Sequence, residues 1–530
     1  MSKLDFIAHS SFKKIAIFLI AISSMLIFYK MTGRSVWVDE GMLLKSIFTN
    51  NFLDFINPLP YYDQAQPFLV SIIHKLISLI SIDFKIIRAI LLIICLASII
   101  FFVIKISQNE KINPFLMALV LFSTILSVGF YLTEIKHYSF EIIATFGMIY
   151  FANNFFKENI SYISTIIFIA LLSIIGFSSI IPACMTIFYI SIFQLYKEKQ
   201  KLFSKKNIFA ILLSLILIAI TYFHMKHLTI FQISNHDVYL SKGIFDDIKS
   251  LAFSALGAYG KVFILVSAFS SIVVLFYSNK KSFLFHLNNI FLLTVTIVTL
   301  AKLVGVYPVI SDRHIVWIVP FSIFIVSLFL NDIFQDKNNK LQILFLLILM
   351  ALFLQTANII YKSFTTELNE RTANNKLYSF VEKMEPSLFV VNPWGKPALD
   401  YYKMILSDLN KHQYIDGKND KKSKLILNTS SKERYEKSVD DVFEEINENN
   451  FYFLMSHLKP IDDESEDIYN SVGYIKEMFS KNNCKYFSIF KDHQVQILKV
   501  ECKNATNPKP QKRDFKRKIY KILCCSPCNK

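Results

Sequence analysis

The sequence predicts an α-helical polytopic membrane protein that ends in a soluble α/β domain. Of its 530 residues, 53% are apolar, and a soluble chain of that composition could not cover its own surface with polar groups. Apolar stretches near the length that crosses a bilayer recur between Ile15 and Tyr361. After Tyr361 charges become frequent, and no stretch of that length returns. The expected domains are therefore residues 1–362 (transmembrane), 363–508 (soluble) and 509–530 (a basic tail that contains cysteines).

About eleven membrane-spanning helices are expected, together with juxtamembrane helices. Lys13 and Lys14 precede the first apolar stretch, as in a signal peptide, but no small-residue cleavage site follows them. We therefore expect a retained first helix with a cytoplasmic N-terminus. The net charge of +16 is attributed to basic cytoplasmic loops, and no nucleic-acid partner is expected. The predicted spans are 15–29, 87–106, 113–130, 139–156, 160–176, 180–197, 208–224, 259–277, 284–304, 314–330 and 341–361.

The segment from Gln66 to Ile82 decides the orientation of every later helix. It is apolar but carries His74 and Lys75 at its centre. If it spans the membrane, the later basic loops, including the run Lys197–Lys206, face outside, against the positive-inside rule. If it is a juxtamembrane or re-entrant helix in the outer interface, those loops become cytoplasmic. We therefore expect a juxtamembrane helix and a C-terminal domain outside the cytoplasm.

With this orientation, four polar clusters fall on the same outer face of the protein. The cytoplasmic loops are mainly short and basic, whereas these clusters collect carboxylates, an arginine and several aromatic residues. A membrane protein that gathers such groups on one face is expected to have a site there. The clusters are WVDEG (Trp37–Gly41), YLTEIKHYS (Tyr131–Ser139), GFSSIIP (Gly176–Pro182) and YPVISDRH (Tyr307–His314).

The acidic pair Asp39–Glu40 follows the first span and opens a long outer loop. A carboxylate beside the membrane can accept a proton from a hydroxyl or amine nucleophile, or it can hold a divalent metal. An acidic pair can also simply solvate a loop, and these residues alone do not decide between the three roles.

Two further clusters contain groups that bind phosphate. Lys136 lies between Glu134 and Tyr138 in the tip between two apolar helices, where a lysine, a histidine or a tyrosine can contact phosphate oxygens. Arg313 precedes another span, and its guanidinium fork together with helix N–H groups suits a phosphate. Each cluster could instead mark the membrane boundary. Together they suit a substrate with a lipid tail and a phosphate-linked head.

At these residues the chain resembles the GT-C membrane glycosyltransferases. That group includes the aminoarabinose transferases of lipid A, the protein O-mannosyltransferases and the rhizobial galacturonosyltransferase type. The resemblance covers roughly residues 30–360, with a weaker match at Leu388–Tyr402. Gln66 stands where many members have His, and Glu141 stands where Asp is commoner. The matching segments, in order, are WVDEG, QPFLVSIIHKL, EIKHYSFEIIATF, FSSIIP and YPVISDRHIVWIVP.

The resemblance implies a role for each matching residue. Asp39 would be the general base that activates the acceptor, and the reaction would invert the anomeric centre as a lipid phosphate leaves. A second set would bind the donor or its phosphate, and a divalent metal ion, if one is used, would be held by Asp39, Glu40 and Glu134. The donor-binding set is Glu40, Gln66, Glu134, Lys136, Tyr138 and Arg313.

The implied function is transfer of a sugar from a polyprenyl-phosphate donor to an envelope glycolipid, glycan or protein on the outer face of the bacterial inner membrane. A flippase or transporter of the same lipid is an alternative, but transporters tend to carry charges or helix breaks at mid-membrane, where most of these spans have none. A glycan polymerase or ligase of another fold remains a second alternative. The sequence leaves the sugar and the acceptor open.

The soluble domain is predicted to be a small α/β unit with a mostly parallel sheet, because apolar runs alternate with helical patterns. Cys484 and Cys502 flank the last two strands and are expected to form a disulfide, whereas Cys95 and Cys184 lie in spans and pack there. The cysteines of the basic tail are not expected to bind metal. The predicted strands are LFVVN, KLILN, FYFLM, KYFSIF and VQILKV, and the predicted helices are Pro397–Leu409, Glu433–Asn447 and Glu466–Phe479.

Overall fold

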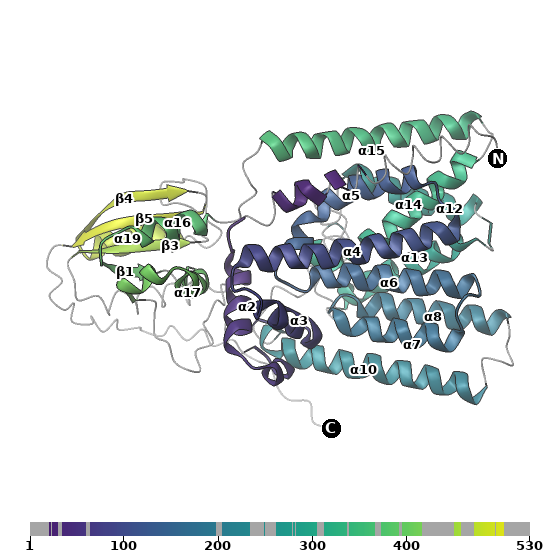
Figure 1. Ribbon diagram of the computed structural model, residues 1–530, viewed down its shortest axis with the longest axis horizontal. Helices are drawn as coiled ribbons and strands as arrows, with labels where there is room; N and C mark the ends of the chain where they lie inside the picture. The colour runs from purple at the N-terminus through teal and green to yellow at the C-terminus, as the bar shows by residue number, and fades with distance from the viewer. Residues whose placement is uncertain are drawn as a thin grey trace, which may run out of the picture.

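The protein consists of a bundle of long helices joined at one end to a smaller domain that contains a sheet (Figure 1). The coordinates are those of a computed structural model. It describes residues 34–59, 64–197, 204–233, 261–277, 279–280, 282–304, 312–335, 339–365, 373–391, 395–415, 450–456, 471–492 and 494–502, with residue 249 and parts of 18–29.

Ten helices of the bundle coincide with the second to eleventh predicted spans, and residues 24–29 of the first are also helical. Long apolar runs with few interior charges explain why these segments are helical, since only a helix satisfies its backbone within one segment in lipid. The ten are α4 (Phe84–Glu110), α5 (Pro114–Thr133), α6 (Tyr138–Phe156), α7 (Tyr162–Leu172), α8 (Ile180–Lys197), α10 (Lys205–Ile233), α12 (Lys261–Tyr277), α13 (Phe283–Leu303), α14 (Ile318–Gln335) and α15 (Asn339–Thr365).

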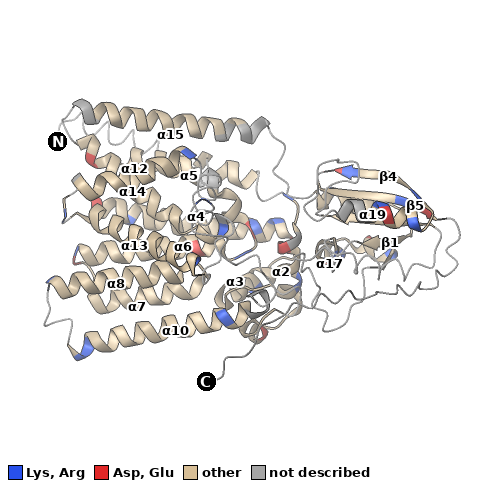
Figure 2. Ribbon diagram, turned by 180° about the vertical axis from the view of Figure 1, so that it is seen from behind, with Lys and Arg blue, Asp and Glu red and all other residues tan. Residues whose placement is uncertain are grey.

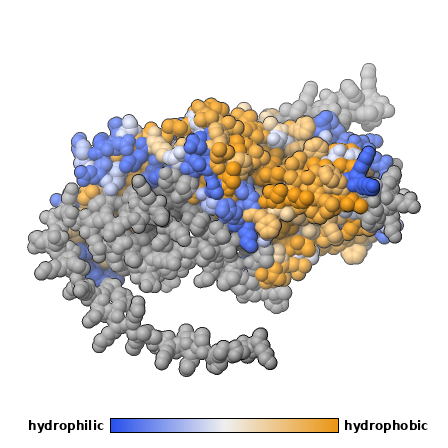
Figure 3. Space-filling model, turned by 90° about the horizontal axis from the view of Figure 1, so that it is seen from below, coloured by the Kyte–Doolittle hydropathy of each residue, from blue (hydrophilic) through white to orange (hydrophobic). Residues whose placement is uncertain are grey.

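Among the described residues, five helices are both long enough and apolar enough to cross a membrane, namely α4, α8, α10, α13 and α14. The surface of the bundle is broadly apolar between hydrophilic ends, as Figure 3 shows. Many of its large apolar side chains face outward, such as Phe223 at 65% exposure and Phe276 at 77%. An apolar surface of this extent indicates contact with lipid. The protein is therefore a multi-pass membrane protein.

The segment from Gln66 to Ile82, which decides the orientation, forms α3 (Phe68–Ser78), and this helix is too short to span a membrane. Its eleven residues rise about 17 Å, against about 30 Å for the hydrocarbon core of a bilayer. The Nζ of Lys75 donates to the carbonyl oxygens of Ile47 and Phe48, at 2.9 and 3.1 Å, and so caps the C-terminal end of α2 (Val38–Thr49). The expected juxtamembrane helix is confirmed, and its lysine has a structural task.

The charged residues of the bundle gather mainly near its two ends (Figure 2). We call the end that carries α2, α3 and the soluble domain the proximal end, and the opposite end, where α4 finishes at Glu110, the distal end. Because consecutive helices alternate in direction, the loops with WVDEG, EIKHYS and GFSS all fall at the proximal end. The sequence predicted this grouping on one face.

The soluble domain holds a five-stranded mixed sheet in the order β2–β1–β3–β5–β4. The prediction of a mostly parallel sheet is wrong, because β2–β1 and β1–β3 pair in parallel but β3–β5 and β5–β4 pair antiparallel. The segments KLILN and Glu433–Asn447 lie outside the described residues. The elements are α16 (Asn374–Glu382), β1 (Leu388–Val391), α17 (Lys396–Ile405), η5 (Ser407–Lys411), β2 (Gln413–Ile415), β3 (Asn450–Ser456), α19 (Ser471–Lys481), β4 (Cys484–Asp492) and β5 (Val495–Cys502).

A disulfide joins Cys484 to Cys502 across the paired ends of β4 and β5, as expected. Cys95 is buried and Cys184 is half-buried in the bundle, and both are free thiols. The cysteines of the basic tail lie outside the described residues.

The soluble domain and the proximal end share one hydrophobic core, so they pack as a unit. Apolar residues of α2, α3 and α4 form a single buried cluster with residues of α16, α17 and the sheet. Gly41 allows the closest approach, because a Cβ there would lie 2.9 Å from the carbonyl oxygen of Pro397. The Tyr401 hydroxyl also bonds Phe84 N at 2.9 Å, and Lys45 pairs with Asp400. The helix that carries the WVDEG motif is therefore fixed from the soluble side.

Candidate functional site

Two predicted site residues from distant parts of the chain, Lys136 and Arg313, meet at a third, Asp39. The Nζ of Lys136 lies 3.4 Å and the NH1 of Arg313 lies 3.3 Å from the same oxygen, Oδ2 of Asp39. The first pair is 97 residues apart in sequence and the second is 274 residues apart. The site is open to solvent, since the side chains of Asp39 and Arg313 are 21% and 31% exposed. A partly exposed carboxylate with two cations can exchange its partners for an anionic ligand.

The position of each group follows from local structure. Asp39 lies in the first turn of α2, where the positive end of the helix dipole favours a carboxylate. Lys136 lies in the non-helical segment between α5 and α6, and its Nζ also donates to Oε1 of Gln64 at 2.8 Å. Arg313 lies in the short 3-10 helix η4 (Asp312–Ile315) that precedes α14. Helix ends thus bring all three side chains to the proximal end.

Glu40 turns away from Asp39 into a fully buried cluster of arginines. Its carboxylate lies 3.2 Å from NH2 of Arg34 and 2.5 Å from NH2 of Arg88, and it also accepts the Ile135 N–H at 3.0 Å. Burial raises the pKa of the Glu40 carboxyl, but the two arginines outweigh it and hold the pKa below its usual value. Both carboxylate oxygens are occupied, so the geometry gives Glu40 a structural position rather than contact with a donor.

The residues do not fit the metal site that the resemblance implied. Glu40 gives its oxygens to Arg34 and Arg88, and Asp39 is paired with two cations. Across the described ranges, no group of three or more His, Cys, Asp or Glu side chains is arranged to hold a metal ion.

The remaining predicted residues surround this cluster. Glu134 is buried and forms the C-cap of α5, two residues before Lys136. Tyr138 opens α6, is also buried and packs edge-on against Tyr131, with ring centroids 5.8 Å apart. Both therefore belong to the wall that carries Lys136.

Gln66 is buried beside α3, where its side chain is held internally. Its Nε2 lies 2.6 Å from Nδ1 of His74, and its Oε1 accepts the hydroxyl of Ser71 at 3.4 Å. Burial lowers the pKa of His74 to about 3, so this ring is neutral at physiological pH. Gln66 therefore supports α3 through these two bonds, and it contacts none of the charged side chains of Asp39, Lys136 and Arg313 in the described bonds.

Sequence reasoning missed three residues of this site, namely Arg34, Arg88 and Gln64. Arg88 is fully buried in the first turns of α4, where it bonds both oxygens of Glu40 and the carbonyls of Arg34 and Ser35. An arginine inside an apolar span is costly and is a signal of a buried partner. That signal was present in the sequence but did not name the partner.

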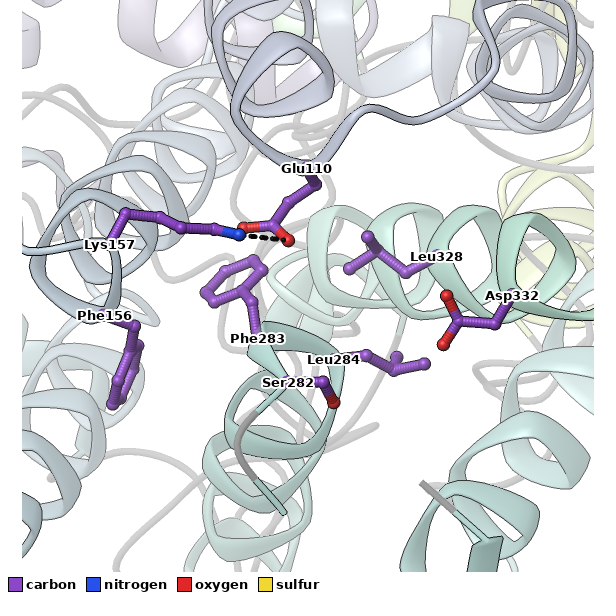
Figure 4. A pocket seen from close by; sticks show the side chains of 8 residues that line it. All are labelled: Glu110, Phe156, Lys157, Ser282, Phe283, Leu284, Leu328 and Asp332. Carbon is purple, nitrogen blue, oxygen red and sulfur yellow. Dashed lines mark ion pairs between the residues drawn. The ribbon is translucent and has the colours of Figure 1, made fainter. Parts of the chain in front are cut away.

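A separate cavity of about 190 Å³ lies at the distal end of the bundle (Figure 4). Glu110 and Lys157 line it and pair at 3.1 Å, and Phe283, Leu328 and Asp332 complete much of its wall. None of the predicted site residues lines this cavity. The charged cluster at Asp39 is therefore the site that the sequence pointed to, and the cavity is not.

Comparisons with known proteins show the fold. No protein-family model and no curated protein matches the chain. Among solved structures, the chain is similar to ArnT from Cupriavidus metallidurans, a crystal structure bound to undecaprenyl phosphate. The two are 10% identical with a TM-score of 0.54, over 91% of this chain and 97% of ArnT. The chain therefore shares the fold of ArnT, in agreement with the GT-C-like fold expected from its motifs.

Proposed function

We propose that this protein is a membrane glycosyltransferase. It moves a sugar from a polyprenyl-phosphate donor to an envelope glycolipid, glycan or protein, and its proximal end faces away from the cytoplasm. The fold supports the general class, and the binding of undecaprenyl phosphate by the similar ArnT supports the donor class. The observation that carries the proposal is the meeting of Lys136 and Arg313 at one oxygen of Asp39.

The chemistry follows from the three side chains. The donor phosphate competes with Asp39 for Lys136 and Arg313, and binding it releases the carboxylate to act as a base. Asp39 then takes the proton of an acceptor hydroxyl or amine as that atom attacks the anomeric carbon. The bond from the anomeric carbon to the phosphate oxygen breaks on the opposite face, so the centre inverts. Lys136 and Arg313 stabilise the negative charge of the leaving polyprenyl phosphate.

The other residues support this arrangement in the proposal. Glu134 and Tyr138 flank Lys136 and are assigned to the same donor site. Glu40 is assigned to positioning, because Arg34 and Arg88 occupy it. Gln66 is assigned to the support of α3 through His74.

The test compares envelope glycoconjugates from cells that lack the gene with those from cells complemented by wild-type or variant protein. With the wild type, mass spectrometry should detect one glycolipid, glycan or protein that carries an added sugar. Asp39→Asn should lose that species, whereas Glu110→Gln at the distal end should retain it. If no glycoconjugate differs between cells with and without the gene, the proposed function is wrong.

An experiment on purified protein separates a transferase from a lipid flippase. A flippase moves its lipid without making a glycosidic bond, so its loss would leave the lipid-linked sugar on the inner side of the membrane. A purified transferase, by contrast, should transfer the sugar to an acceptor in a detergent extract of the envelope and release free polyprenyl phosphate, although no two sides of a membrane exist there. Such release by the wild type, with none by Asp39→Asn, supports transfer.

A further inference from the structure

The segment Glu134–His137 connects α5 to α6 and carries Lys136, yet it has no regular secondary structure. A lysine side chain has high conformational entropy, so its ammonium group is well placed only if the backbone that carries it is fixed. Glu40 fixes one side of Lys136 by accepting the Ile135 N–H at 3.0 Å. A second contact is needed on the other side of Lys136.

Glu141 lies on that other side, one turn into α6. It is 1% exposed, and its Oε1 accepts the backbone N–H of Ser178 at 2.9 Å. Its Oε2 accepts the hydroxyl of the same serine. The carboxylate thus binds the turn of residues 176–179 between α7 and α8 to the start of α6. We call this turn the 176–179 turn.

His137, which directly follows Lys136, is held between Glu141 and the 176–179 turn. Its Nε2 lies 3.7 Å from Oε1 of Glu141, and its ring meets Phe177 edge-on with centroids 4.8 Å apart. Burial and then the charge of Lys136 lower the pKa of His137 well below its usual value, so the ring is neutral. The 176–179 turn therefore packs against the backbone neighbour of the phosphate-binding lysine.

At position 176 only glycine permits this packing without a shift of the turn or of the Glu141 side chain. A Cβ at position 176 would lie 2.0 Å from Cγ and 2.8 Å from Oε1 of Glu141. Real atoms never approach so closely, so an alanine would push the turn and the Glu141 side chain apart. The Glu141 side chain therefore fills the space that a side chain at position 176 would need.

We propose that Glu141 is a positioning residue that holds the 176–179 turn against His137 and so fixes Lys136 for binding of a lipid phosphate. This inference rests on the proposed function, because it takes Lys136 as a ligand of the donor phosphate. Glu40 and Glu141 then act as two buried clamps, one on each side of Lys136, and neither touches the substrate.

The test measures binding of undecaprenyl phosphate to purified protein in detergent, which does not depend on turnover. Gly176→Ala should raise the Kd about tenfold or more, because it displaces the clamp. Glu141→Ala should also raise the Kd. In the Glu141→Ala background, Gly176→Ala should have little further effect, because the atoms that it would strike have been removed.

Gly147→Ala is the matched control, since it also adds a methyl group at a close contact of α6 but away from the site. Its Cβ would lie 2.8 Å from Cδ1 of Leu172, the flexible end of a side chain that can move. Gly147→Ala should lower thermal stability without changing the Kd. If Gly176 had only a structural role, Gly176→Ala would likewise lower thermal stability and leave the Kd unchanged.

An unchanged Kd in Gly176→Ala and Glu141→Ala overturns the inference, and so does a wild type that does not bind undecaprenyl phosphate. Additive effects of the two changes would also contradict it. The proposed function is judged separately by sugar transfer. A wild type that transfers sugar, together with variants of normal Kd, would contradict the clamp alone. A wild type that binds lipid phosphate without transferring sugar would contradict the proposed function alone.

Discussion

The two ends of the helical bundle both contain ion pairs, but they distribute charge differently. At the distal end Glu110 and Glu158 each have one cation, Lys157 and Lys197 respectively. At the proximal end Asp39 and Glu40 each have two, so that four cations share two carboxylates. Paired charges neutralise each other, whereas two cations on one carboxylate leave positive charge for another anion. The cluster at Asp39 is therefore suited to bind a phosphate.

The proximal end also divides its two carboxylates between chemistry and structure. Asp39 is partly exposed and can change partners, whereas Glu40 is fully buried and holds Arg34, Arg88 and the Ile135 N–H. Adjacent residues on a helix point about 100° apart, so neighbouring acids can serve a solvent-facing site and a buried one. The following predictions test this division and the contrast between the ends.

The largest expected effect is that of Asp39→Asn on sugar transfer. Loss of a general base lowers the rate by roughly 10²–10⁴-fold. Glu110→Gln, which removes a carboxylate of the distal end, should keep the wild-type rate. The measurement is turnover by purified protein with a polyprenyl-phosphate sugar. Near-normal turnover by Asp39→Asn would assign Asp39 to structure.

Glu40→Gln should act on folding rather than on chemistry. It leaves Arg34 and Arg88 buried without a counter-charge, a change that costs about 3–5 kcal/mol for a buried pair. The fraction of monodisperse protein in detergent and its thermal midpoint should both fall. Glu158→Gln, in an exposed distal pair, should leave both unchanged. Full stability with lost donor binding would instead place Glu40 at the substrate.

Gly41→Ala should weaken the contact between α2 and the soluble domain. The new Cβ meets backbone atoms, at 2.9 Å from Pro397 O and 3.2 Å from Ala398 N, and backbone cannot turn aside as a side chain can. Overpacking of this kind costs about 1–3 kcal/mol. Because α2 carries Asp39, we expect lower turnover together with the lower thermal midpoint. Gly129→Ala, whose Cβ meets only the Ile27 side chain, is the control and should retain turnover.

The smallest effect concerns pH. His74 has a folded pKa of about 3, whereas an unfolded histidine titrates near 6.5. Below pH 6.5 the unfolded state binds a proton that the folded state does not, so stability falls as pH falls. By pH 5 the loss is at most about 2 kcal/mol.

Glu40 does not contribute in this window, because its pKa lies below the usual carboxyl value and its stabilising charge is lost only at lower pH. Thermal midpoints at pH 7.5 and pH 5 should therefore differ less in His74→Gln than in the wild type. An equal pH dependence in the two proteins would show that other groups account for the loss.

Much of the bundle could be predicted because a spanning helix is specified by a long, local, apolar pattern. The grouping of Asp39, Lys136 and Arg313 on one face followed from counting helix directions, which depended on the Lys/Arg bias that excluded Gln66–Ile82 as a span. The partners of Glu40 could not be predicted, because Arg88 lies 48 residues away and nothing local links the two. Likewise, the contact of Glu141 with Ser178 joins positions 37 apart through a tertiary turn.

The soluble domain was harder to predict because strand direction depends on connections and neighbours. β2 has only three residues, Gln413–Ile415, too few for a pattern to be visible. β4 and β5 are separated by two residues, and that short connection is a signal for an antiparallel hairpin. The antiparallel pairing of β5 with β3 had no such local signal. The disulfide was predictable because its cysteines bracket that hairpin.

The most direct test of the central claim is a titration of undecaprenyl phosphate against Lys136→Gln, Arg313→Gln and the double variant. A charge-assisted hydrogen bond contributes about 1.5–3 kcal/mol, so each single change should raise the Kd about 10- to 150-fold. If both cations bind one phosphate, the double variant should differ from the product of the singles. Arg313→Lys should also be defective, because it keeps the charge but loses the planar fork. Unchanged Kd values in both single variants would contradict the account, because the two cations at Asp39 would then not form the phosphate site.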